Sequence, residues 1–178
     1  MLELTLLGLA AQSPRSGYDF KSLFESTALR QFSSSPGSIY PALKRLEARE
    51  WLESAVKGSA GDRSRRIYRP TSRGRKALRE WLVADPTVEE IERDPRLPIL
   101  RFSLLGTIDP PPEDVARFLE RLESAARRYI EVVEQSKREM ERLQEPFPAL
   151  ALEHGSRSLE TLADWSREAR RAFTAEVS

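Results

Sequence analysis

The chain has 178 residues, of which 39% are hydrophobic, so it can bury a core as one small unit or two tightly joined ones, and disorder over most of its length is excluded. It has no cysteine and one histidine, His154, which excludes disulfides, thiolate metal sites and a Cys–His catalytic pair. The net charge of +1 hides an asymmetry: residues 1–84 hold 15 Lys and Arg against 8 Asp and Glu, a net of +7, and residues 85–178 hold 14 against 20, a net of −6. Such a sign difference indicates that the first half meets a polyanion.

Two helices are predicted at the start of the chain. A leucine-rich segment from Leu2 stops at Ser13-Pro14 and predicts a buried first helix. Ser16 and Asp19 then have the spacing of a capping box, and the apolar residues Phe20 and Leu23 follow on one face. The second helix should therefore begin at Ser16 and run for roughly three turns.

A third helix is predicted to end near Glu50, and its two sides differ in chemistry. One side carries an apolar stripe that consists of Ile39, Ala42, Leu43 and Leu46. Tyr40, Lys44 and Arg45 project from the other side as a phenol and two cations. A packed stripe opposite an aromatic and cations is typical of a helix that lies in a groove of DNA.

The start of this helix is open between two serines. If Ser35 is the N-cap, Pro36 takes the favoured first position, but Pro41 then falls where a helical N–H is needed. If Ser38 is the N-cap, Pro41 falls in the first turn, where its missing donor costs little. In either case we expect an irregular or tightened first turn.

A hairpin and a fourth helix are predicted next. Residues 52–57 and the stretch around Ile67 and Tyr68 read as two strands joined by a Gly-containing tip. Three arginines on or beside the tip are placed to reach phosphate or a minor groove, namely Arg63, Arg65 and Arg66. Thr71 can cap a helix that runs through Trp81. Three helices, a hairpin and a helix follow one another in the order of a winged helix-turn-helix domain.

These residues resemble the PadR family of bacterial transcriptional regulators. The resemblance covers nearly all of the N-terminal half and is most specific in the block 35–46, SPGSIYPALKRL. Weaker matches in the same order are Leu6-Leu7-Gly8-Leu9, Ser16-Gly17-Tyr18-Asp19-Phe20, and Arg66-Ile67-Tyr68-Arg69 followed by Thr71 and Gly74. The resemblance implies that Tyr18, Ser38, Tyr40, Lys44 and the wing arginines lie at the DNA surface. Pro70 departs from the family, which usually has an apolar aliphatic residue there, and leaves the strand pairing at that point open.

The C-terminal half reads as a connector followed by helices. Residues 85–98 are acidic and contain proline, which suits a connector, and residues 99–108 form a strongly apolar helix that needs a cover. From Val115 to Leu143 an apolar stripe continues for about eight turns, or some 45 Å. We expect that stripe to pack against a partner chain through Phe118, Leu122, Tyr129, Val133 and Met140. A last helix, from Leu152 to Phe173, can fold back antiparallel on the long one.

The resemblance agrees with a helical C-terminal domain that forms a homodimer, and some members of the family respond to small aromatic effectors near the dimer interface. In this chain Trp81, Phe102 and Trp165 are the strongest candidates to line such a cavity, with Tyr129 and Phe173 as further aromatics. No sequence feature identifies an effector, and no cofactor is expected.

The sequence therefore predicts a mainly α protein with a small β-hairpin. It should have a winged helix-turn-helix domain over 1–84, a connector over 85–98 and a helical, coiled-coil-like dimerisation domain over 99–178. We expect a homodimeric repressor that binds a pseudo-palindromic operator. The alternative is a winged-helix module for protein assembly, which the basic face of the third helix disfavours. An enzyme is the weakest interpretation because no catalytic constellation is present. With no apolar run long enough to cross a bilayer and no signal-peptide pattern, a cytoplasmic location is expected.

Overall fold

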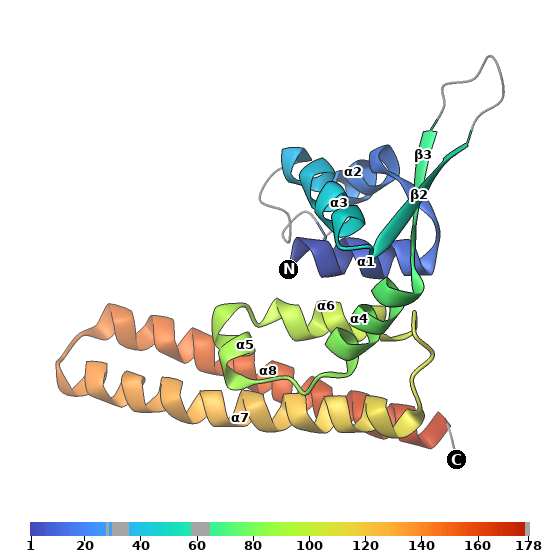
Figure 1. Cartoon of the computed structure of the whole chain (residues 1–178). Coiled ribbons are helices and arrows are strands. Elements are labelled where there is room, and N and C mark those ends of the chain that lie inside the picture. The colour runs from blue at the N-terminus through green and yellow to red at the C-terminus, as the bar shows by residue number, and fades with distance from the viewer. Residues whose placement is uncertain (28, 30–35, 58–64, 177–178) are drawn as a thin grey trace. The chain divides into compact units, whose positions relative to one another are not determined.

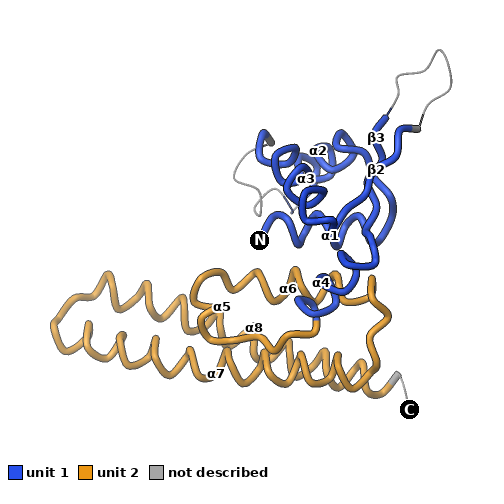
Figure 2. Tube along the Cα trace, in the orientation of Figure 1, with its two compact units in different colours: residues 1–82 blue, residues 83–178 orange. Residues whose placement is uncertain are grey.

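The chain divides into two compact units, each with its own hydrophobic core (Figure 2). The computed structural model describes residues 1–27, 29, 36–57 and 65–176. Unit 1 comprises Met1–Leu82 and unit 2 comprises Val83–Ser178. Unit 1 carries all the strands of the described residues, whereas the described part of unit 2 is built from helices (Figure 1). The sequence expectation of a mainly α fold with a small β element is therefore confirmed.

The four helices predicted for the N-terminal half are present in unit 1. They are α1 (Leu2–Gln12), α2 (Gly17–Ser26), α3 (Ile39–Ala48) and α4 (Ser72–Val83). Their largest fully buried side chains are Leu6, Leu7, Phe20, Ile39, Leu43, Leu46, Leu78 and Leu82. The predicted apolar stripe of the third helix is thus the part of α3 that faces the core.

A short 3-10 turn precedes α3, as the sequence led us to expect. This turn, η2 (Pro36–Ser38), runs directly into α3, and Pro41 falls in the first turn of the α-helix. The missing N–H of Pro41 therefore breaks no intrahelical hydrogen bond. Ser38 occupies the N-cap position, although its side chain makes no capping hydrogen bond. Ser35, the alternative cap, lies outside the described residues.

The wing is a three-stranded antiparallel sheet. Its strands are β1 (Arg15–Ser16), β2 (Leu52–Lys57) and β3 (Arg65–Pro70), and β3 lies in the middle. The pairing of β2 with β3 extends to Leu52 opposite Pro70, so the proline does not end it early. The predicted hairpin is confirmed. The strand β1 was missed because two residues are too few to show an alternating pattern.

A glycine allows α4 to start close to the turn that leads into β2. Thr71 caps α4, since its Oγ1 accepts a hydrogen bond from the Gly74 N–H at 3.0 Å and donates one to the Glu50 carbonyl at 2.6 Å. A Cβ atom on Gly74 would overlap the carbonyl oxygen of Trp51. Because backbone cannot yield as a side chain can, this approach requires glycine.

The segment from 85 to 98 is more ordered than a connector. It contains α5 (Val88–Arg93) and the start of α6 (Arg96–Leu105), and Ile91 of α5 is buried. The Arg101 side chain is buried as well, and it donates hydrogen bonds to Glu90 at 2.6 Å and to the Ala84 carbonyl. Its guanidinium also lies over the Phe118 ring, 5.0 Å from the centroid. The sequence predicted a connector because the segment is acidic and contains proline. In the structure Thr87 caps α5, Glu89 and Glu90 lie in its first turn, and Pro95 precedes α6.

Two long antiparallel helices form the body of unit 2, and they correct the predicted dimer seam. The helices α7 (Pro112–Arg142) and α8 (Pro146–Glu176) each span 31 residues and lie side by side (Figure 1). The last helix is longer than the range from Leu152 to Phe173 that the sequence predicted. In fact Phe118, Leu122 and Val133 are buried within the single chain, and Tyr129 and Met140 are half-buried. A partner chain is therefore not needed to cover this stripe.

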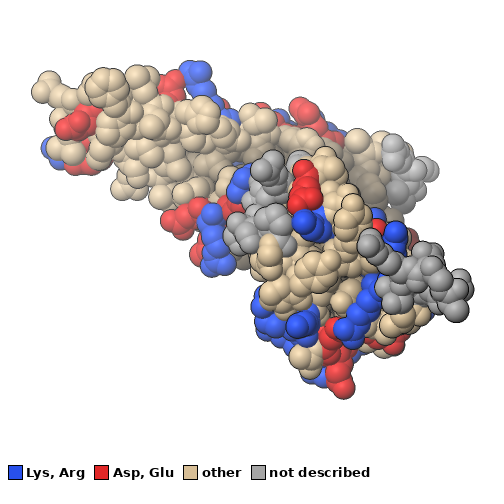
Figure 3. Space-filling model, turned by 90° about the horizontal axis from the view of Figure 1, so that it is seen from above, with Lys and Arg blue, Asp and Glu red and all other residues tan. Residues whose placement is uncertain are grey.

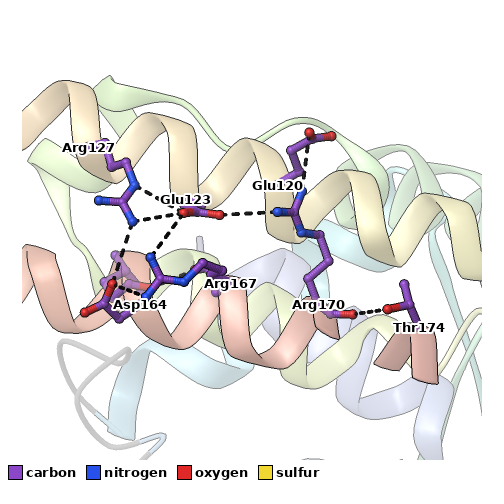
Figure 4. A network of polar contacts seen from close by, with 9 residues as sticks. Glu120, Glu123, Arg127, Asp164, Arg167, Arg170 and Thr174 are labelled. Carbon is purple, nitrogen blue, oxygen red and sulfur yellow. Dashed lines mark hydrogen bonds and ion pairs between the residues drawn. The ribbon is translucent and has the colours of Figure 1, made fainter. Parts of the chain in front are cut away.

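An ion-pair network joins α7 to α8 on one side of their apolar seam (Figure 4). At its centre, the Glu123 carboxylate lies 3.0 Å from Arg127, 4.0 Å from Arg167 and 3.6 Å from Arg170. Arg167 also pairs with Asp164 at 2.9 Å. Because Glu123 is only 15% exposed, these contacts are screened less than ordinary surface pairs. The network fixes which residues of α7 lie opposite which residues of α8.

Truncating the seam should destabilise unit 2. Leu122 is fully buried, so Leu122→Ala removes apolar contacts and leaves a cavity, which should lower the free energy of unfolding by about 2 to 5 kcal/mol. The measurement is urea denaturation followed by circular dichroism. Val132→Ala on the same helix is the control, because Val132 is exposed and its loss should cost within about 0.5 kcal/mol. Equal effects would contradict the burial of Leu122.

Candidate nucleic-acid interface

The side of α3 that faces away from the core carries the polar residues predicted to bind DNA. Tyr40 is 48% exposed and Lys44 is exposed, while the stripe from Ile39 to Leu46 is buried. Lys44 has no ion pair with any residue that the structure describes. The division of α3 into a packed side and an accessible side is therefore as predicted.

An open cleft lies between the start of α2, the exposed side of α3 and strand β3. It has a volume of about 570 Å³. Its lining combines small residues, phenols and two cations, namely Ser16, Gly17, Tyr18, Tyr40, Arg65, Arg66 and Tyr68. Four of the residues predicted from sequence at the DNA surface, Tyr18, Tyr40, Arg65 and Arg66, are thus brought together here.

Glycine at position 17 lets the Tyr40 ring close one side of the cleft. A Cβ atom on Gly17 would stand 2.5 Å from Cε1 of Tyr40, which is well inside the normal contact distance. Any larger residue at position 17 would push the ring away. The close match between α2 and α3 at this point therefore depends on the smallest side chain.

A capping box fixes the backbone beside Tyr18. The Asp19 N–H donates to Ser16 Oγ at 3.2 Å, and the Ser16 N–H donates to Asp19 Oδ2 at 2.8 Å, as the sequence predicted. The hydrogen bond that the Ser16 N–H donates to the Asp19 carboxylate is the main cause that lowers the pKa of Asp19 below its usual value. Tyr18, between them, is 67% exposed and projects from a rigid first turn.

Arg45, predicted to face DNA, makes an ion pair with α1 instead. Its Nε lies 2.5 Å from Oε1 of Glu3, and Nη1 of Arg49 lies 2.7 Å from Oε2 of the same carboxylate. Arg49 also lies over the Trp51 ring, at 5.4 Å from its centroid. Glu3 therefore ties the second half of α3 to the start of α1.

Arg66 is held in a closed ring of contacts between the wing and α3. Its Nη2 lies 3.0 Å from Oε1 of Glu47, and its Nε donates to Ser54 Oγ at 2.6 Å. Ser54 Oγ in turn donates to the same Glu47 oxygen at 2.6 Å. The Arg66 guanidinium lies 5.8 Å from the centroid of the Tyr68 ring, and burial is the main cause that raises the pKa of the Tyr68 phenol. This ring of contacts orients β3 against α3.

Of the remaining residues predicted at the DNA surface, Ser38 and Arg65 are described by the structure. Ser38 is half-buried in η2, and Arg65 is exposed on β3, where its charge helps to lower the pKa of Asp19. Arg63 lies outside the described residues. No local pattern in the sequence reports Glu3, Glu47 and Ser54, because their partners lie 7 to 46 residues away along the chain.

The aromatic residues suggested for an effector cavity fall into different units. Phe102 and Trp165 of unit 2 meet edge to face, with ring centroids 5.2 Å apart, and Phe102 lies 6.4 Å from Phe118. Trp81 lies on α4 of unit 1. The first two residues are therefore part of an aromatic cluster inside unit 2.

The described residues lack two further features. They contain no group of three or more His, Cys, Asp or Glu side chains placed to hold a metal ion. None of the helices in this part of the chain is both long enough and apolar enough to span a membrane.

Comparison with known families finds two matches that together cover most of the chain. Residues 6–80 match the transcriptional regulator PadR-like family, and residues 104–174 match the family described as virulence activator alpha C-term. The first match includes the capping box, α3 and the wing; the second spans most of the α7 and α8 hairpin.

Curated relatives are similar over part of the chain. The negative transcriptional regulator PadR of Bacillus subtilis is 27% identical over 94 residues, which are 53% of this chain and 52% of that protein. The transcriptional regulator Rv3488 of Mycobacterium tuberculosis is 52% identical over 60 residues, 34% of this chain and 52% of that protein. The matched region thus spans about half the length of each of these relatives.

Solved structures with similar folds include two regulators of Bacillus. Bacillus subtilis PadR in complex with operator DNA gives a TM-score of 0.44 at 19% identity, over 97% of this chain and 98% of that one. The PadR-like regulator BC1756 of Bacillus cereus gives 0.42 at 20% identity, over 99% of each chain. Residues 6–80, which include α3 and the wing, carry the domain of the PadR-like family of transcriptional regulators.

Proposed function

We propose that the protein binds double-stranded DNA sequence-specifically and represses transcription, with the exposed side of α3 in the major groove. The observation that carries this proposal is the cleft, where Tyr18, Tyr40 and Arg65 from three elements surround an accessible face beside Lys44. Phenols, cations and a helix start are groups that bind phosphate oxygens. The net charge of +7 over residues 1–84 supports a polyanionic partner.

The proposed contacts differ in what they contribute. Tyr18, Ser38, Tyr40 and Arg65 would position the domain on the phosphate backbone, whereas Lys44 has the reach and exposure to contact a base edge. The alternative, a winged-helix module for protein assembly, would not need exposed cations beside the cleft. Selection of duplexes from a random library distinguishes the two functions. Enrichment of one motif supports the proposal, and a library that stays random contradicts it.

A homodimer is proposed on geometric grounds. Two copies related by a two-fold axis would present their recognition helices to half-sites about 34 Å apart, which predicts a pseudo-palindromic operator. The strongest apolar candidate for a contact between copies is the turn end of the α7 and α8 hairpin. There Leu143, Phe147 and Leu150 are between 50% and 83% exposed.

The aromatic pair of Phe102 and Trp165 is where a small aromatic effector would bind. The structure of Bacillus subtilis PadR in complex with p-coumaric acid concerns a relative at 18% identity and a TM-score of 0.44. In this chain, a small aromatic effector beside Phe102 and Trp165 would first have to separate the two rings, because they already contact each other.

Lys44→Ala should weaken binding to the selected duplex without unfolding the protein, because its side chain is exposed on α3. A base contact would cost about 1 to 3 kcal/mol at one position of the duplex, whereas a phosphate contact would lower the salt slope of log K by about 0.9. Fluorescence anisotropy measures both quantities. Lys76→Ala, an exposed lysine on α4, is the matched control. An affinity equal to that of the control would remove Lys44 from the interface.

Arg65→Ala and Arg66→Ala should behave differently. Losing Arg65 should reduce affinity for selected and random duplexes by similar factors, as positioning contacts do. Losing Arg66 should in addition destabilise unit 1, because Glu47 and Ser54 lose their shared partner. Titration of both duplexes, together with urea denaturation, separates the two effects. A loss with Arg65→Ala that is confined to the selected duplex would mean that Arg65 reads sequence.

Glutamate at the turn of the hairpin should prevent dimerisation. Phe147→Glu combined with Leu150→Glu would place two charges in the proposed apolar contact, so the variant should sediment as a monomer at micromolar concentration. Both residues are exposed in the single chain, so its fold should be retained. Val56→Glu introduces one such charge at an exposed site of unit 1 and should stay dimeric. A dimer that survives the double substitution must be built on another surface.

A further inference from the structure

We propose that Glu3 limits how many cations the recognition helix offers to DNA, by holding Arg45 and Arg49 on the protein. The inference rests on the proposed function, since it concerns the strength and selectivity of DNA binding. It assigns a specificity role to a residue of α1, outside the helix-turn-helix and the wing.

One carboxylate binds Arg45 of α3 and Arg49, the C-cap residue of that helix. Arg45 and Arg49 are four residues apart on the helix, so their side chains lie on the same face one turn apart. Each takes a different oxygen of Glu3, at 2.5 Å and 2.7 Å. Both oxygens are therefore engaged, and the pairing has the short distances of charge-assisted hydrogen bonds.

The burial of the three side chains is unequal. The Glu3 side chain is 18% exposed, whereas those of Arg45 and Arg49 are 54% and 52% exposed. A phosphate could reach the arginines from solvent, but taking them would leave the largely covered carboxylate without its donors. Removing one partner of such a pair costs more than removing a fully exposed one. Glu3 therefore competes effectively with phosphate for Arg45 and Arg49.

This competition bears on specificity. Non-specific affinity comes almost entirely from the number of phosphates that Lys and Arg neutralise, whereas specific binding gains from base contacts as well. When Glu3 holds these two arginines, affinity for non-specific DNA falls, because fewer phosphates are neutralised. The base contacts that distinguish the correct sequence are kept. Figure 3, which views the molecule from above, shows Lys and Arg side chains interleaved with Asp and Glu rather than gathered in one unbroken patch.

The test is the salt dependence of binding to a short fluorescein-labelled duplex of mixed sequence. Glu3→Gln keeps the shape of the side chain but removes its charge, and should steepen the slope of log K against log salt by about 0.9 to 1.8 units. Glu139→Gln is the matched control, because it makes the same charge change and releases an arginine, Arg142, on α7 of unit 2. That control should leave the slope unchanged.

A second comparison uses the arginines. Replacing both Arg45 and Arg49 with glutamine should leave the slope unchanged while Glu3 is present, and should restore the wild-type slope in the Glu3→Gln background. A lower slope for the arginine variant with Glu3 intact overturns the inference, and this arm holds even if Glu3→Gln fails to fold. Equal slopes for Glu3→Gln and Glu139→Gln overturn it too. Absence of binding by the wild-type protein at low salt overturns the proposed function itself.

Discussion

The burial of one stripe of α3 is the constraint on which the rest of unit 1 depends. Ile39, Ala42, Leu43 and Leu46 are all fully buried, which fixes the rotation of the helix about its axis. Because successive residues of a helix are rotated by about 100°, this rotation of α3 places Tyr40 and Lys44 on its outward side. The same stripe therefore holds the core together and orients the proposed DNA-binding side. A core substitution in α3 would disturb both at once.

Around this helix, much of the positive charge is used to join elements rather than left accessible. Glu3 pairs with Arg45 and Arg49 on one side of α3, and Glu47 pairs with Arg66 of the wing. Each carboxylate is largely covered while its arginines are about half exposed, so these contacts brace α3 against α1 and β3. Fewer cations are therefore accessible than the 15 Lys and Arg side chains of residues 1–84 would suggest.

Unit 2 is stabilised differently, because two helices of equal length pack their apolar side chains against each other. The apolar side chains of α7 meet α8 along the hairpin, and Glu123 with its three arginines fixes the alignment on one side. What remains exposed and apolar is concentrated where the hairpin turns, at Leu143, Phe147 and Leu150. The contact between copies that we propose therefore lies at this turn rather than in the seam.

The sequence by itself determined the features that depend on neighbours a few residues apart. Helical spacing placed α3 and its two sides, the Ser16 and Asp19 pair located the start of α2, and the glycine-containing tip predicted the hairpin. Only the tertiary structure decided which cations are engaged, since Glu3 finds Arg45 from 42 residues away. It also decided that Leu122 is buried within the single chain, since burial depends on packing that a repeating pattern does not encode. Local periodicity reports the direction of a side chain, and only the assembled fold reports what that side chain meets.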